Sequence, residues 1–152
     1  MRGAEGERLA RTLAANVRPA DRDEWEAASG KPFDMALWTA LLLNHNHTWM
    51  LLHDDRCLML FGVSPYEWNP TGVGAAWLVA TKEAEEKVHT MHRFFRQGIA
   101  ELHKVCPKLN AWAYHKNKLH HEWMRRMGFK DTGGRCPIGS RGEMFHLFTK
   151  DA

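Results

Sequence analysis

Hydrophobic residues in the second half of the chain follow two spacings, which predict a strand, a helix and a second strand in that order. Residues 73–81 form an almost unbroken apolar run, which is typical of a central strand covered on both faces. From Val88 to Leu102 the apolar residues recur every three or four positions, which predicts a long helix that ends before Pro107. Residues 109–115 form a second apolar run of strand length. Elements of these lengths predict a right-handed parallel crossover.

The middle of the chain has the pattern of a helix followed by a hairpin. From Phe33 to Leu42 apolar residues occupy most positions, so we expect a helix that is buried over much of its circumference. Residues 48–53 and 56–63 are two short apolar runs, and Asp54 and Asp55 separate them. Turn-forming residues between two such runs predict an antiparallel hairpin.

The N-terminal segment has weaker signals. Residues 1–15 predict an arm or a short helix, because their few apolar positions lie four apart among charged residues. Residues 16–19 end in proline, which indicates the end of a brief extended segment. We then expect Asp21 to cap a helix, with Glu24 as its capping-box partner, and Gly30 to end that helix.

The last third of the chain completes the predicted domain. Residues 119–127 have helical spacing and Gly128 follows them, which predicts a short helix. Two strands are expected near residues 129–132 and 143–150. Together the elements predict one α/β (α+β) domain over residues 16–152, with a mixed central sheet flanked by helices on both faces.

Composition narrows the class of protein. The 152 residues are 44% hydrophobic and 26% charged, and the net charge of +3 is spread along the chain, so we do not expect nucleic-acid binding. Cys57, Cys106 and Cys136 lack metal-site spacing and are expected to be reduced thiols of a cytoplasmic protein. The longest nearly apolar stretch, residues 35–43, is too short to cross a bilayer, and the N-terminus does not have the apolar run of a signal peptide.

Three short motifs, in this order of elements, resemble those of a known superfamily. Residues 16–21 (Asn-Val-Arg-Pro-Ala-Asp) are similar to its start, residues 76–79 (Ala-Trp-Leu-Val) to its central strand, and residues 117–129 to its signature of asparagine, helix and Gly-Phe. Over about residues 17–150 the chain resembles the GNAT superfamily of CoA-dependent N-acyltransferases. The resemblance implies the GNAT fold and, where the site is intact, transfer of an acyl group from acyl-CoA to an amine.

A narrower resemblance concerns phage proteins. The strand that bears Trp77, a basic and aromatic long helix without glycines at its start, and the helix after Asn117 are similar to those of the small GNAT-like internal virion proteins of short-tailed phages and prophages. This resemblance implies a protein partner, and a location in the cytoplasm of the host cell or in the virion.

The family resemblance also implies a cofactor site. It places Leu78, Val79 and Ala80 of the central strand, together with Asn117, against acyl-CoA, with Asn117 on the pantetheine arm. Asn117 has a second interpretation, because an asparagine just before Leu119 is also typical of a helix N-cap.

The start of the long helix argues against this cofactor. In GNAT proteins a glycine-rich turn there offers backbone N–H groups and the positive end of the helix dipole to the pyrophosphate. Residues 81–87 have no glycine, and Glu83, Glu85 and Glu86 lie in the predicted first turn, where each stabilises the helix by about 0.3–1 kcal/mol and repels phosphate. Met124 stands where the family often has a tyrosine that protonates the leaving thiolate, and a thioether cannot donate a proton.

We therefore expect a degenerate acyl-CoA site, no bound cofactor, and a function through protein interaction. The alternative is an active N-acyltransferase that uses acetyl-CoA. For that alternative His115 is a candidate general base, because it ends a predicted central strand where open α/β sheets place their ligand crevice, although a packing role suits it too. Glu67 is a second candidate base, or a solvated carboxylate of its loop. The ten histidines have no zinc-motif spacing, so no metal site is expected.

Overall fold

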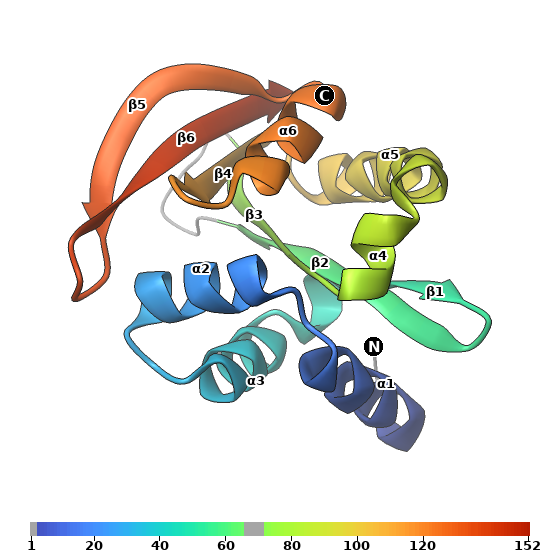
Figure 1. Ribbon diagram of the computed structural model, residues 1–152. Coiled ribbons are helices and arrows are strands. Elements are labelled where there is room, and N and C mark those ends of the chain that lie inside the picture. The colour runs from blue at the N-terminus through green and yellow to red at the C-terminus, as the bar shows by residue number, and fades with distance from the viewer. Residues whose placement is uncertain (1–2, 66–71) are drawn as a thin grey trace.

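The computed structural model describes residues 3–65 and 72–152, and it has one mixed sheet with helices on both faces (Figure 1). The sheet order is β1-β2-β3-β4-β6-β5, and every neighbouring pair is antiparallel except β3 with β4, which is parallel. The predicted fold class and the parallel crossover are therefore confirmed. The strands are β1 (Thr48–His53), β2 (Arg56–Pro65), β3 (Val73–Ala80), β4 (Lys108–Tyr114), β5 (Lys130–Ile138) and β6 (Glu143–Asp151). The helices are α1 (Gly3–Ala15), α2 (Pro19–Ser29), α3 (Phe33–Leu43), the 3-10 helix η1 (His45–His47), α4 (Lys82–Glu86), α5 (Val88–Val105) and α6 (Lys118–Arg126).

The predicted hairpin and the opening extended segment are both present. Asp54 and Asp55 have φ angles of 48° and 61°, and two positive φ values are what a two-residue hairpin turn of matching twist requires. Asp is one of the few residues other than glycine that adopt this conformation readily. The extended segment is reduced to a single bridge between Val17 and Thr81.

The capping box predicted for the second helix is wrong. α2 begins at Pro19, with Arg18 at the N-cap position and no side-chain capping bond. Asp21 and Glu24 lie inside the helix and are buried. Their carboxylates instead accept hydrogen bonds from the sheet and from α6, because buried donors there need partners. Gly30 ends the helix with a φ of 68°, as predicted.

The predicted long helix is two helices. α4 ends at Glu86, Lys87 departs from helical geometry (φ −106°, ψ 36°), and α5 starts at the next residue. The hydroxyl of Thr81 caps α4 by accepting a bond from the N–H of Ala84. Glu83 and Glu85 therefore lie in the first turn of α4, whereas the first turn of α5 holds no acidic residue.

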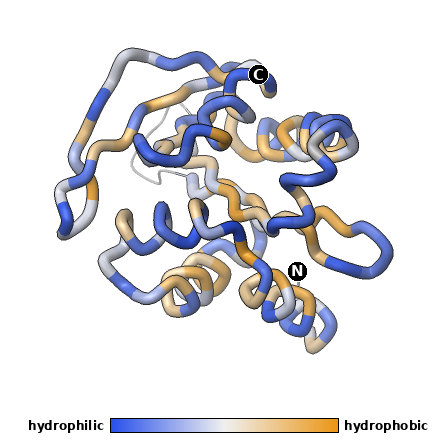
Figure 2. The backbone as a smooth tube through the Cα atoms, viewed as in Figure 1, coloured by the Kyte–Doolittle hydropathy of each residue, from blue (hydrophilic) through white to orange (hydrophobic). Residues whose placement is uncertain are grey.

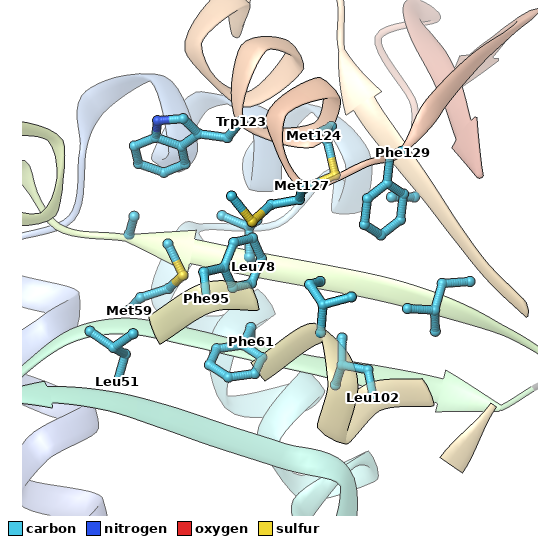
Figure 3. Close-up of a cluster of buried hydrophobic side chains, with 14 of the residues drawn as sticks. Leu51, Met59, Phe61, Leu78, Phe95, Leu102, Trp123, Met124, Met127 and Phe129 are labelled. Atoms are coloured by element: carbon cyan, nitrogen blue, oxygen red, sulfur yellow. The ribbon is translucent and has the colours of Figure 1, made fainter. Parts of the chain in front are cut away.

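Two buried clusters lie on opposite faces of the sheet. Figure 2 shows that the central strands and α3 are largely hydrophobic, whereas the β1–β2 turn is hydrophilic. The cluster beneath α5 and α6 is drawn in Figure 3 and includes Met59, Phe61, Leu78, Phe95, Leu102, Trp123, Met124 and Phe129. The cluster beneath α1 and α3 includes Leu9, Leu13, Phe33, Leu37, Leu41, Leu60 and Val79. In the part of the chain that the structure describes, no helix is both long and apolar enough to cross a membrane.

The burial predicted for α3 is only partly correct. One face of the helix is buried through Phe33, Leu37 and Leu41. Leu42 and Leu43 are each 77% exposed, although the sequence pattern is apolar around the helix. The pattern overstated burial because α3 lies at the outside of its layer and turns only one side to the core.

Gly98 allows α5 to lie close to the sheet, and this contact can be tested. A Cβ at Gly98 would lie 2.5 Å from Cζ of Phe61, a buried ring packed against Phe95. In an exposed helix Gly→Ala stabilises by about 1 kcal/mol. Here we expect Gly98→Ala to lower the free energy of unfolding by about 1–3 kcal/mol, because the core has no room for the methyl group. Urea denaturation measures this change.

Ala100, which is exposed on the same helix, is the matched control. Ala100→Gly should cost about 1 kcal/mol through helix propensity alone. A stabilised Gly98→Ala variant would show that α5 does not pack on Phe61 in this way.

Candidate functional site

The candidate site lies where β3 and β4 part. Their parallel pairing covers only residues Val73, Gly74 and Ala75 of β3, opposite residues 108–110 of β4. Beyond this point the facing edges of the two strands carry backbone N–H and C=O groups with no partner on the neighbouring strand. Buried groups of this kind must find other partners.

Asp21 supplies a partner at the end of β3. Its Oδ2 accepts a 2.7 Å bond from the N–H of Ala80, and its Oδ1 accepts bonds from Arg18 (2.6 Å) and from the amide of Asn117 (2.9 Å). Asp21 is 1% exposed, and Arg18 is also buried and reaches Glu85 of α4 at 3.0 Å. Burial raises the pKa of Asp21, and the positive charge of Arg18 opposes that shift. One carboxylate therefore joins α2, β3 and the start of α6.

Glu24, one turn later on α2, does the same at the end of β4. It accepts a 2.7 Å bond from the N–H of Tyr114, and Nδ1 of His120 on α6 lies 3.0 Å from its Oε1. Trp25 donates its indole N–H to the carbonyl of Leu78 at 3.1 Å. The side chains of α2 thus form hydrogen bonds with backbone groups of β3 and β4 that are unpaired where the two strands separate.

The Glu24–His120 pair is buried, with both residues 6% exposed or less. Burial alone lowers the pKa of His120, but the adjacent Glu24 carboxylate, and Asp21 beyond it, raise that pKa by more, so the net shift is upward. Buried ion pairs cost desolvation energy, and perturbed titratable groups of this kind gather at functional sites. Because Nδ1 of His120 is paired with Glu24, Nε2 of His120 is the atom that can exchange a proton with a bound molecule.

Two cavities meet at this pair. The larger holds about 400 Å³ on the side of α2 and α3, and the smaller holds about 10 Å³ on the side of α5 and α6. His120 lines both, as do Ala76, Trp77 and Leu78 of β3. The other main residues of the larger cavity are Glu24, Trp25, Lys31, Trp112, Ile138 and Phe145. The pair therefore lies at the junction between the two faces of the sheet.

The start of α5 differs from what the sequence suggested. α5 has 18 residues, and Lys87 at its N-cap position makes no side-chain capping bond. Only Lys87 lies between Glu86, the last residue of α4, and the first residue of α5, where the positive end of the helix dipole lies. Burial lowers the pKa of His92 on α5, and the cations Arg126 of α6 and Arg96 lower it further. Glu122 of α6, which pairs with Arg126 at 3.3 Å, acts in the opposite direction on that pKa.

Only one of the two predicted catalytic residues, His115, lies in the described part of the chain. His115 follows β4, is half-buried, and stacks edge-on against Tyr114, and its N–H donates to the carbonyl of Met144. It is not among the residues that line the two cavities. Glu67 lies outside the described residues. The catalytic role of each stays a prediction.

Of the predicted cofactor residues only Leu78 lines the two cavities, and a cofactor role for all of them stays a prediction. Leu78, Val79 and Ala80 are buried on β3, and α2 binds the carbonyl of Leu78 and the N–H of Ala80. The interpretation of Asn117 as a side-chain cap is wrong, because its amide donates to Asp21 and makes no capping bond to α6. Its Oδ1 is buried without a hydrogen-bond partner in the described structure.

Sequence reasoning named Asn117 as a site residue but missed Asp21, Glu24 and His120. Asp21 and Glu24 are three residues apart on α2, and so are Asn117 and His120 around the start of α6, a spacing that places each pair on one helix face. That signal was present, but it also fits the capping box and the N-cap. No local pattern says that the two faces meet, since the contacting pairs are 96 residues apart.

A metal site has no support in the geometry. Among residues 3–65 and 72–152, no group of three or more histidine, cysteine or carboxylate side chains is placed to hold a metal ion.

Solved structures with the same arrangement are numerous. No protein-family model matches the sequence, and no curated protein does either. Ribosomal-protein-alanine N-acetyltransferase from Brucella melitensis matches with a TM-score of 0.69 and 13% identity, over 100% of this chain and 98% of that one. An N-acetyltransferase from Staphylococcus aureus Mu50 matches with a TM-score of 0.69 and 16% identity, over 99% and 96%. The protein has the GNAT acetyltransferase fold.

A third GNAT-fold structure is that of YncA from Salmonella typhimurium with its cofactor acetyl-CoA, with a TM-score of 0.69 and 11% identity, over 99% of this chain and 91% of that one. Identities this low establish the fold alone. The narrower resemblance to phage internal virion proteins receives no support from these comparisons.

The Asp21 contacts predict a large loss of stability on truncation. Asp21→Ala leaves Arg18 and the N–H of Ala80 buried without this partner, so the free energy of unfolding should fall by about 3–5 kcal/mol. Asp23→Ala is the control, since its ion pair with Arg141 is half exposed and contributes about 1 kcal/mol or less. Chemical denaturation of both variants tests this, and equal losses would contradict the role given to Asp21.

The Glu24–His120 pair predicts a specific titration. The pKa of His120, followed by NMR, should lie above 6.5 and should fall in Glu24→Gln. His121 serves as an internal control, because burial lowers its pKa. A raised folded-state pKa means that the pair stabilises the fold fully below pH 6.5 and less as the pH rises through that pKa. A His120 pKa that Glu24→Gln leaves unchanged would contradict the assignment.

Proposed function

We propose that the protein is an N-acyltransferase that uses acetyl-CoA. The observation that carries the proposal is the buried Glu24–His120 pair, placed where β3 and β4 part: both residues line the larger cavity, and His120 also lines the smaller one on the other face of the sheet. The pair also holds the open end of β4, but buried titratable groups with shifted pKa values that line a cavity are typical of functional sites. The YncA structure with acetyl-CoA supports the same choice at the level of the fold.

Two features of the chain fit acetyl-CoA. The start of α5 offers N–H groups and the positive end of a helix dipole to the phosphates. Asn117 offers a buried carbonyl oxygen without a partner, which suits an N–H of the pantetheine arm. Phe95, Met124 and Phe129, which line the smaller cavity, must move apart to admit that arm.

The residues of the chain then have defined tasks. The acceptor amine binds in the larger cavity and gives a proton to Nε2 of His120, while Glu24 orients the imidazole and stabilises its charged form. Acetyl-CoA would supply the acetyl group as a thioester: its C–S bond would break as the N–C bond to the amine forms, and the leaving thiolate would take up the proton that His120 removed from the amine. The raised pKa of His120 means that the base is available only above that pKa.

Replacement of His120 should remove most of the activity. With acetyl-CoA and an amine acceptor, we expect His120→Gln to lower kcat/KM by about 10²–10⁴-fold, the usual contribution of a general base. In the wild type kcat/KM should rise with pH through the pKa of His120. Rates of thiol release across pH 5 to 9 give both results.

His115→Gln, made in parallel, separates the two candidate bases. It should retain activity if His120 is the base, because His115 lies outside both cavities. If activity were lost in His115→Gln and kept in His120→Gln, His115 would be the general base. A calorimetric titration that detects no binding at millimolar acetyl-CoA would contradict the enzyme proposal as a whole.

One observation favours a second function, action through a protein partner without acyl transfer. The cavity on the side of α5 and α6 has room for about one water molecule, and α2 already binds the backbone groups of Leu78 and Ala80. This is the function that the phage-type resemblance implies. A folded protein that ignores acetyl-CoA in the calorimetric titration would support it.

A further inference from the structure

The walls of the larger cavity are mainly apolar and include three tryptophans. Trp25, Trp77 and Trp112 come from α2, β3 and β4, and Ile138 and Phe145 come from the β5–β6 hairpin. The rings of Trp25 and Trp77 meet edge to face at 5.6 Å, and the bond from Trp25 to Leu78 fixes this arrangement. The cavity is thus a preformed apolar site, and about 400 Å³ is the volume of a small-molecule pocket.

The charges of the cavity are few and separated. Glu24, paired with His120, is the one carboxylate among the described residues that line it, and Lys31 is a cation. A ligand with a single amino group can therefore place that group at Glu24 and His120. A second ammonium group would find apolar walls or a like charge, and each is unfavourable.

The apolar walls also favour the reactive form of an amine. A low-dielectric site lowers the pKa of an amine and so favours the neutral, nucleophilic form. Bringing a polyamine to the same site requires neutralising or burying several charges at once, whereas an amine on a hydrocarbon group requires only one.

We propose that the acceptor is a small primary amine with one charge and an aromatic or branched hydrocarbon group. This rests on the proposed function, since it names the substrate class of the same site. The hydrocarbon group packs among the tryptophans, and the amino group lies beside the Glu24–His120 pair. Polyamines such as spermidine are excluded because their further ammonium groups would meet apolar walls or Lys31.

Binding can be measured without acetyl-CoA. Titration of the ¹⁵N-labelled protein with 2-phenylethylamine should shift the indole N–H signals of Trp25, Trp77 and Trp112, and should leave that of Trp49, which stacks on Phe61 near β1, unchanged. Spermidine at equal concentration should shift none of the three. Equal shifts with spermidine, or shifts confined to Trp49, would overturn the proposal.

Two variants keep the test independent of folding. Trp112→Ala removes a wall, and Ala28→Phe, at an exposed position of α2 that lines the cavity, fills space instead of creating it. Each should raise the Kd for 2-phenylethylamine at least tenfold, and Trp49→Phe should not. Unchanged Kd values in folded Ala28→Phe protein would place the amine elsewhere and refute the inference.

The two proposals fail in different ways. If 2-phenylethylamine binds among the tryptophans but no acetyl transfer occurs with acetyl-CoA, the enzyme proposal fails and the binding specificity stands. If spermidine is acetylated and 2-phenylethylamine is neither bound nor acetylated, the enzyme proposal stands and the acceptor class is wrong.

Discussion

The fold depends on how two strands that separate are held at their open ends. β3 and β4 pair for only three residues each, and beyond that point their backbone groups face a gap. Two carboxylates of α2 satisfy the N–H groups of Ala80 and Tyr114, so one helix replaces part of a sheet ladder. Since these carboxylates are buried, they need cations or donors of their own, which Arg18, Asn117 and His120 provide.

The position of the candidate site follows from this constraint. Glu24, which binds the open end of β4, and its partner His120 also line the larger cavity, where a molecule can reach them. The same Glu24 that orients His120 also binds the backbone of β4. Replacing Glu24 would therefore affect the sheet and the proposed catalysis together. His120 bonds to the side chain of Glu24, so His120 can be replaced with less effect on the sheet.

Most of the fold could be predicted from the sequence because it depends on local spacing. The apolar run of β3, the helical period of α5 and the Asp54–Asp55 turn each carry their own signal. The site could not be predicted in the same way. Asp21 and Asn117 have polar side chains suited to helix caps. In the folded sheet these residues, 96 apart in sequence, instead form a hydrogen bond with each other. The break at Lys87 was missed because the apolar period continues through α5 regardless of where it begins.

The carboxylates of α2 link occupancy of the junction to proton balance. A molecule that takes the N–H of Ala80 from Asp21 leaves a negative charge in a dry interior with one donor fewer, and such a charge is relieved by taking up a proton. The heat of binding for any such molecule would then include the ionisation heat of the buffer, and its affinity would rise in acid. The hydrogen bond between Asp21 and Ala80 thus couples ligand binding at this point to the uptake of a proton from the solvent.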